Sequence, residues 1–220
     1  MADQHCADLR NHLVPPTHAH PRCRSILEAI ATFGGSTDAR QAAARLVDEF
    51  GSAAAALAAP AEWQLRVTLG DKATVGALRQ FRVATRYLLR RQIDSAPIIA
   101  NWQALLDYLH LDLAHRVVET FRVLHLNTRN RLIRDEIMDE GTIDRTTIHV
   151  REVIRRCLEL GSAAIILVHN HPSGNPGPSN ADIDITRALY DTAQRLGIAL
   201  HDHLIIGSQG HVSLKAKGLF

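Results

Sequence analysis

The sequence has few cysteines, no long apolar run and little net charge. Its three cysteines, at positions 6, 23 and 157, form no Cys-x-x-Cys pair. That pattern argues against a disulfide framework and against a cysteine-rich zinc finger, and it is typical of a reducing cytoplasm, where we expect the protein to reside. No stretch of about 18 apolar residues is present, so no membrane span is expected, and no secretory signal is visible at the N-terminus. A net charge of +2 does not identify a polyanionic partner.

The chain is long enough for one domain of ordinary size and a small second one. It has 220 residues, of which 46% are hydrophobic, so a packed core is expected and wholesale disorder is not. Residues 1–20 lack periodicity and predict a flexible arm. Residues 21–96 show helical patterning with short connections, and Pro97 interrupts it.

From residue 97 onward the pattern is mixed. Helices are predicted over 102–110, 151–160 and 179–196. Strands are predicted over 120–126, 132–138, 147–150, 163–168, 198–206 and 211–214. The fold class is therefore α+β: a C-terminal mixed sheet with flanking helices, preceded by a small all-helical domain.

One short segment carries the clearest chemical signal. His169 and His171 close the apolar run of residues 163–168, and Ser179 and Asp182 follow them. Side chains at i and i+2 of an extended segment point the same way, so both imidazoles can face one point. With one carboxylate they would bind zinc and leave a fourth position open, as in catalytic sites. The other two His-x-His pairs, at 18/20 and 201/203, lack Ser and Asp at these offsets.

Part of this segment has a purely structural alternative. Ser179 and Asp182 fit a capping box, with Ser179 as N-cap and Asp182 at the third helical position. Capping and catalysis do not exclude each other, because they use different lone pairs and protons of the serine.

The pattern His169-x-His171-x7-Ser179-x2-Asp182 matches the JAMM (MPN-plus) metalloprotease motif without a gap. With the surrounding His-Asn-His-Pro-Ser-Gly stretch, the chain resembles the RadC family, the bacterial branch of that fold. The resemblance implies a JAMM/MPN-like domain over 97–220 with layering like that of cytidine deaminases. It further implies a Zn²⁺ cofactor on His169, His171 and Asp182, and Asp202 and His203 match a family pattern that suggests support of the sheet or of the ligands.

The family also needs a distant glutamate, about 45–50 residues before the first histidine. Glu119 precedes a predicted strand, and 169 − 119 = 50. Glu136 is the alternative. The resemblance implies a zinc metallopeptidase that cleaves a peptide or isopeptide bond, with Glu119 as general base and Ser179 as donor to the oxyanion. The substrate, a protein or peptide, is not identified.

The N-terminal helices resemble a degenerate helix-hairpin-helix module, which would bind DNA phosphates. In the hairpin, Thr68 or Val67 replaces the first glycine, and Asp71 puts a negative charge where a phosphate would lie.

On the long helix that follows, four arginines form one stripe: Arg79, Arg82, Arg86 and Arg90. A buried stripe is predicted beside them, formed by Leu78, Phe81 and Leu88. The arginines are either a solvated face or a surface for DNA. The alternative function is therefore a DNA-binding accessory protein in repair or recombination, with the metal domain as scaffold. A metal-free interaction module is a third alternative.

Overall fold

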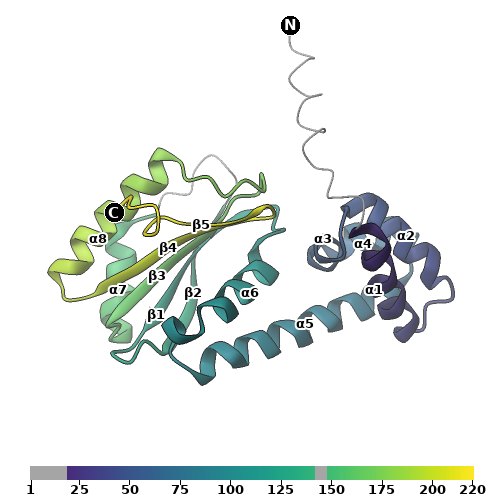
Figure 1. The fold of residues 1–220 in the computed structure, drawn as a ribbon, viewed down its shortest axis with the longest axis horizontal. Coiled ribbons are helices and arrows are strands. Elements are labelled where there is room, and N and C mark those ends of the chain that lie inside the picture. The colour runs from purple at the N-terminus through teal and green to yellow at the C-terminus, as the bar shows by residue number, and fades with distance from the viewer. Residues whose placement is uncertain (1–18, 142–147) are drawn as a thin grey trace, which may run out of the picture. The chain divides into compact units, whose positions relative to one another are not determined.

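The computed structural model describes residues 19–141 and 148–220, which form two compact units (Figure 1). The first unit extends to Thr85 and the second runs from Arg86 to Phe220, so the two units divide within helix α5 (Lys72–Ser95), and the domain boundary at residue 97 stays a prediction. The predicted arm lies outside the described residues except for positions 19 and 20, which begin helix α1 (Ala19–Phe33).

The first unit contains only helices in its described part. After α1 come α2 (Ala39–Phe50), α3 (Ala53–Ala58), α4 (Ala61–Val67) and the first half of α5. Local signals set their ends: Gly51 ends α2 in the left-handed conformation with φ 75°, and the Ser52 side chain accepts a hydrogen bond from Ala55 N to start α3. The helices pack around Leu27, Ile30, Leu46, Val47 and Leu78.

The buried stripe predicted on α5 is wrong in two of three positions. Leu78 is fully buried, but Phe81 is 49% exposed and Leu88 is 62% exposed. Helical spacing placed them on one face, yet only the first part of that face meets the core of the first unit.

The second unit is a five-stranded mixed sheet with helices on both faces. After the 3₁₀ turn η2 (Ile98–Asn101) and helix α6 (Trp102–Leu113) come β1 (Glu119–Leu126), β2 (Leu132–Gly141), α7 (Val150–Leu160), β3 (Ala164–Asn170), α8 (Asn180–Arg195), β4 (Ala199–Gly207) and β5 (Gly210–Ser213). The strand order is β2-β1-β3-β4-β5. Only β3 and β4 are parallel, because α8 joins them as a crossover.

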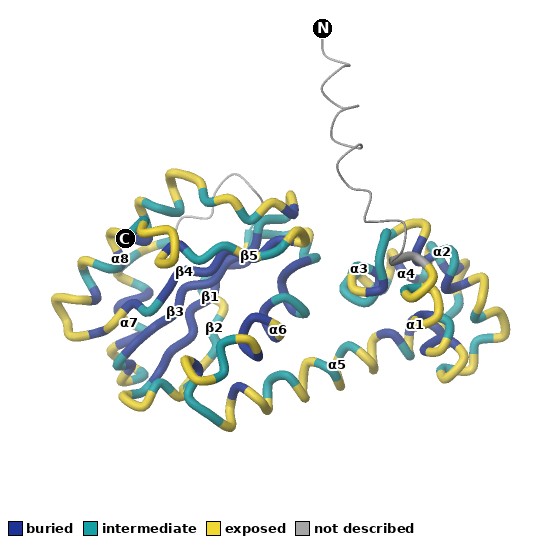
Figure 2. Tube along the Cα trace, viewed as in Figure 1, coloured by how far each residue is buried: buried dark blue, intermediate teal, exposed yellow. Residues whose placement is uncertain are grey.

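Each face of this sheet has its own core. Leu124, Ile166 and Leu204 pack with α6 on one face, whereas Phe121 and Leu167 pack with α7 and α8 on the other. Strand β3 is buried along its whole length, as the dark central strands of Figure 2 show. A strand covered on both faces needs apolar residues at every position, which explains the continuous run that predicted it.

The predicted strand at 147–150 is wrong. Thr147 lies outside the described residues, Ile148 and His149 belong to no strand, and Val150 begins α7. β-branched residues dominate this segment and favour a strand locally, but residues 148–149 join none of the five strands.

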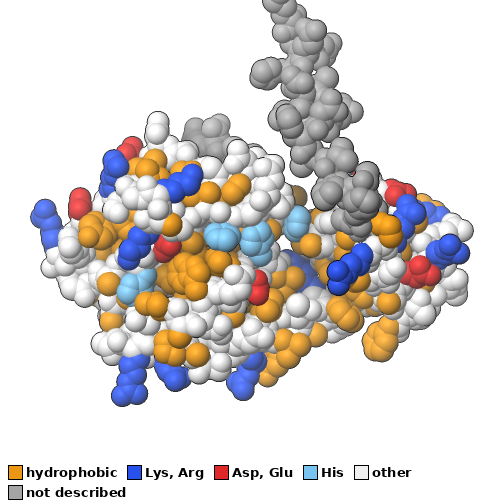
Figure 3. Space-filling view, viewed as in Figure 1, with side chains coloured by type: hydrophobic (Ala, Val, Ile, Leu, Met, Phe, Trp, Pro, Cys, Tyr) orange, Lys and Arg blue, Asp and Glu red, His pale blue; other side chains and the backbone are white. Residues whose placement is uncertain are grey.

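The surface of the described residues carries mixed charge. On the face drawn in Figure 3, Lys and Arg side chains lie singly or in small groups among uncharged and acidic ones, without a continuous basic area over the described part. Among the described helices, none is both long enough and apolar enough to cross a membrane.

Candidate metal centre

The end of β3 and the start of α8 bring the candidate ligands together. His169 lies on β3 with its side chain 2% exposed, and His171 follows directly, with 18% of its side chain exposed. The His171 amide donates to Ile206 O at 2.9 Å, so the extended path continues past the end of β3. Both imidazoles therefore point to the same side, as the i and i+2 spacing predicts.

The capping box predicted at the start of α8 is present. The Ser179 side chain accepts from Asp182 N at 3.2 Å, and Ser179 N donates to Asp182 Oδ2 at 2.7 Å. The Ser179 hydroxyl also donates to Asp182 Oδ2, at 2.7 Å. The cap fixes the Asp182 carboxylate at the positive end of the helix, where a negative charge is stabilised.

Two imidazole nitrogens and the Asp182 carboxylate converge. His169 Nε2 lies 3.0 Å from His171 Nε2 and 3.2 Å from Asp182 Oδ1, and His171 Nε2 lies 3.6 Å from Asp182 Oδ2. Ligand atoms about 2.0–2.1 Å from a tetrahedral zinc ion are about 3.3 Å apart. Within residues 19–141 and 148–220, this is the one group of three or more His, Cys, Asp or Glu with such spacing.

The hydrogen bond of His171 shows that the site fits a cation. His171 Nδ1 lies 3.0 Å from Asn175 O, and a carbonyl oxygen can only accept. The ring proton is therefore on Nδ1, and Nε2 presents a lone pair toward His169 and Asp182. When both rings are neutral, two imidazole nitrogens and a carboxylate meet without a proton between them, which is a suitable ligand set for Zn²⁺.

The electrostatics of the centre also favour positive charge. Burial opposes ionisation of Asp182, but the hydrogen bonds of His169, His171 and Ser179 outweigh it and hold the pKa of Asp182 well below its usual range. The hydrogen bond to Asp182 raises the pKa of His171, and the charge of Glu119 adds to this effect. The carboxylates thus attract a proton or a metal ion to the same place.

Glu119 begins β1 on the side of the sheet that carries the ligands. It pairs with Gly141 on β2, and Phe121, two residues on, pairs with His169 on β3. Because β-strand side chains alternate, Glu119 and Phe121 share a face.

The alternative glutamate is already engaged elsewhere. Glu136 lies in the middle of β2 and accepts from Arg156 Nη2 at 2.8 Å and from Arg156 Nε at 3.0 Å. This two-point contact uses both of its oxygens. The geometry therefore favours Glu119 over Glu136 as the base.

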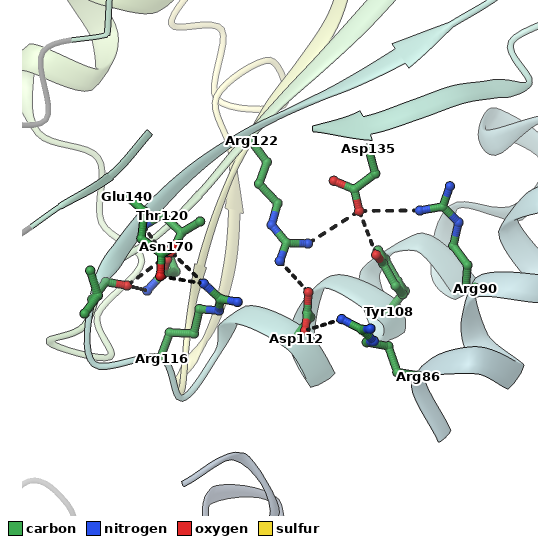
Figure 4. A network of polar contacts seen from close by, with 11 residues as sticks. Arg86, Arg90, Tyr108, Asp112, Arg116, Thr120, Arg122, Asp135, Glu140 and Asn170 are labelled. Atoms are coloured by element: carbon green, nitrogen blue, oxygen red, sulfur yellow. Dashed lines mark hydrogen bonds and ion pairs between the residues drawn. The ribbon is translucent and has the colours of Figure 1, made fainter. Parts of the chain in front are cut away.

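Asn170, between the two histidines, fastens the backbone on both sides of Glu119. Its Oδ1 accepts from Thr120 N at 2.9 Å, and its Nδ2 donates to Val118 O at 3.1 Å (Figure 4). Because Asn170 is 1% exposed, this pair of hydrogen bonds is shielded from water. The strand that carries the candidate ligands thus fixes where β1 begins.

Comparison with known proteins matches this domain to one family. A family model described as "RadC-like JAB domain" matches residues 99–219. A UPF0758 protein of Rhodobacter capsulatus is 46% identical over 182 residues, which are 83% of this chain and 85% of that protein. A UPF0758 protein of Ruegeria pomeroyi is 41% identical over 181 residues, which are 82% of this chain and 81% of that protein.

The chain belongs to the RadC-like JAB domain family.

The RadC-like domain contains all five candidate residues, namely Glu119, His169, His171, Ser179 and Asp182. The mixed sheet with flanking helices that the resemblance implied is confirmed. The matched region begins close to the boundary predicted at residue 97, and the N-terminal helices lie outside it.

Three of the four arginines predicted as a stripe contact other residues of the chain. Arg82 Nη1 donates to Ala58 O at 2.9 Å. Arg86 Nη1 lies 3.8 Å from Asp112 Oδ1, and Arg90 forms ion pairs with Asp94 and with Asp135 at 3.0 and 3.6 Å. Arg79 is exposed. The predicted stripe is thus largely used within the protein, and DNA binding stays a prediction.

Two of these contacts join a buried charge cluster beneath the sheet (Figure 4). Arg122 on β1 donates to Asp112 and lies 3.4 Å from Asp135 Oδ2. The Tyr108 hydroxyl donates to Asp135 Oδ2 at 2.6 Å. The cluster fastens α6 and the second half of α5 to the sheet face opposite the candidate ligands.

At the predicted helix-hairpin-helix turn, Asp71 caps α5. Its carboxylate accepts from Thr74 N at 3.0 Å and from the Ser36 hydroxyl at 2.5 Å. Burial opposes its ionisation, but these hydrogen bonds outweigh it and lower the pKa of Asp71. The carboxylate thus occupies a helix N-terminus of the kind that binds phosphate.

Sequence reasoning missed two residues with hydrogen bonds in and behind the candidate site. Asn175 accepts the Nδ1 proton of His171, and Thr186 lies one helical turn after Asp182 against His203. The spacing of Asp182 and Thr186 places them on one helix face and is the signal that could have identified Thr186. His203 was matched only through the family pattern, and its contact with His169 needs the fold.

Proposed function

We propose that the RadC-like domain is a zinc-dependent hydrolase that cleaves an amide bond, of the peptide or isopeptide kind. The observation that carries the proposal is the convergence of His169 Nε2, His171 Nε2 and the Asp182 carboxylate, whose Oδ1 lies 3.2 Å from His169 Nε2 and whose Oδ2 lies 3.6 Å from His171 Nε2, with the His171 lone pair directed inward. Family membership supports it, because the motif of this chain has no gap.

His169, His171 and Asp182 would hold the ion. When bound, zinc lowers the pKa of a water molecule to about 7 and polarises a carbonyl group. Glu119 takes a proton from the attacking water and returns it to the nitrogen of the leaving amine. Its place at the open end of β1, partly exposed, keeps the carboxylate accessible to substrate.

Ser179 has a second task besides capping. Its proton now goes to Asp182 Oδ2, and its oxygen accepts from Asp182 N. To stabilise the oxyanion, the hydroxyl rotates its proton from the carboxylate to the substrate oxygen while the cap from the amide remains. Loss of one such donor typically lowers the rate by about 10²–10³.

The first test is metal content. We expect about one zinc per chain in native protein purified without chelators, measured by elemental analysis, because the three ligands match a catalytic zinc set. His169→Ala and Asp182→Ala should lose the metal. His211→Ala removes an exposed histidine on β5 and should retain it. Metal-free native protein would refute the proposal.

The second test addresses the reaction. Protein substrates treated with the wild type and with Glu119→Gln are compared by mass spectrometry of new amino termini and of released lysine side chains. We expect cleavage by the wild type only, with zinc content equal in both proteins. Equal cleavage by both would remove Glu119 from the mechanism, and Glu136→Gln then tests the alternative base.

A further inference from the structure

The buried ring of His203 lies between a candidate metal ligand and helix α8. His203 is on β4 and is fully buried. Its Nε2 lies 2.9 Å from His169 Nδ1, and its Nδ1 lies 2.5 Å from Thr186 Oγ1. The Phe121 ring contacts both imidazoles, with centroid distances of 6.5 Å to His169 and 6.0 Å to His203. The two nitrogen contacts are therefore shielded from water.

The direction of each hydrogen bond follows from Thr186, which ends the series of contacts that starts at His169. Thr186 Oγ1 is hydrogen-bonded to the backbone carbonyl oxygen of Asp182, which can only accept. The single hydroxyl proton of Thr186 therefore goes to Asp182 O. Thr186 Oγ1 must then accept from His203, so the His203 proton is on Nδ1.

The same argument determines which nitrogen of the His169 ring carries the proton. With its proton on Nδ1, neutral His203 has a lone pair on Nε2 and accepts from His169 Nδ1. His169 is thereby held with a proton on Nδ1 and a lone pair on Nε2, the atom that faces His171 and Asp182. Metal-binding histidines need this arrangement, and a partner on the second nitrogen fixes both tautomer and ring orientation.

We propose that Thr186 and His203 are positioning residues that hold His169 in its metal-binding tautomer, through hydrogen bonds that start at the backbone carbonyl of Asp182. This inference rests on the proposed function, because the ligand that it serves is His169. Asp182 takes part twice: its carboxylate faces the ion site and its carbonyl anchors the hydrogen bonds behind it. A shift of α8 would disturb both imidazole and carboxylate together.

The chain offers a matched pair of variants. Thr186→Val removes the hydroxyl at nearly constant volume. Thr192→Val does the same on the same helix, where Thr192 Oγ1 donates to Ala188 O at 2.7 Å in an exposed position without an imidazole. Zinc dissociation constants are measured on the full chain by competition with a chromophoric chelator. We expect about tenfold to hundredfold weaker binding for Thr186→Val and no change for Thr192→Val. Wild-type affinity in folded Thr186→Val would overturn the proposal.

A second pair tests His203 itself. His203→Gln keeps an oxygen acceptor within reach of His169 Nδ1, and His203→Leu does not. Zinc affinity should be retained better by the glutamine variant than by the leucine variant. Equal affinity in the two folded variants would contradict the role of the acceptor.

One measurement needs no substitution. Nitrogen-15 NMR of the histidine rings in the metal-free wild type should show a proton on Nδ1 of both His169 and His203. A proton on Nε2 alone in either ring overturns the proposal. Failure of the wild type to bind zinc would refute the proposed function, whereas this spectrum would still decide the hydrogen-bond directions.

Discussion

His125 should make the stability of the protein depend on pH. Its side chain is fully buried on β1, where Nδ1 lies 2.9 Å from Ser162 Oγ and Nε2 lies 3.6 Å from Glu136 Oε2. Burial lowers the pKa of His125 from 6.5 to about 4, although the nearby Glu136 opposes the shift. Between these values the unfolded chain binds a proton that the folded chain does not.

The sign and the size follow from this difference. Because the unfolded state binds more protons, the free energy of unfolding falls as the pH decreases from about 6.5 toward about 4. A difference of about 2.5 pKa units corresponds to a ceiling of about 3 kcal/mol, of which about 2.5 kcal/mol is lost between about pH 7.5 and pH 4.5. That is a large part of a typical stability of about 5–15 kcal/mol.

The assay is urea unfolding of metal-free protein in chelator over this pH range. His125→Gln lacks the titrating group, so its stability should fall by about 2.5 kcal/mol less than that of the wild type. His211→Gln changes an exposed histidine and should keep the wild-type slope. Parallel wild-type and His125→Gln curves would refute the reasoning.

Three further changes test other parts of the structure. Arg122→Met removes the buried counter-charge of Asp112 and Asp135, which then keep the longer contacts to Arg86 and Arg90 at 3.8 and 3.6 Å, so we expect a loss of about 3 kcal/mol in urea unfolding. A loss under about 1 kcal/mol would contradict this, since exposed pairs contribute only that much. Gly207→Ala would place a Cβ 2.2 Å from Gly174 O and displace the loop that follows His171, so zinc affinity should fall. Gly76→Ala is the control: its Cβ would meet nothing within 4 Å, and this variant should bind zinc normally. Ser179→Ala removes the N-cap and should lower the free energy of unfolding by about 0.5–2 kcal/mol. Amide cleavage should also become slower by about 10²–10³. A loss of stability without a loss of rate would mean that Ser179 is a helix cap and nothing more.

Sequence alone predicted the elements whose pattern is local. The apolar run of β3 and the Ser179–Asp182 box depend on neighbours within a few residues, and both are present. The sequence allows the capping box and a role at the metal site together. In the structure the cap is what directs Asp182 toward His169.

Features set by distant contacts could not be predicted in this way. Phe81 and Leu88 follow helical spacing, yet the core of the first unit does not extend along α5 to meet them. Arg86 and Arg90 looked like a solvated or DNA-binding face because their partners, Asp112 and Asp135, come from other elements. Whether a helix face is buried depends on the element that packs against it. The periodicity of the sequence carries no information about that element.

The three candidate ligands come from segments of unequal rigidity. His169 lies on β3, which is paired along both edges, so its amide should exchange hydrogen only when the whole sheet opens. Asp182 lies in the first turn of α8 and His171 lies next to an exposed loop, where local fraying takes much less free energy. Transient opening of that turn would detach the carboxylate and break the hydrogen bonds that run from Asp182 O through Thr186 and His203 to His169, while β3 itself stays paired. If the proposed ion is bound, its exchange would not require global unfolding, and the rate at which it leaves should follow the opening of α8 and not the stability of the sheet.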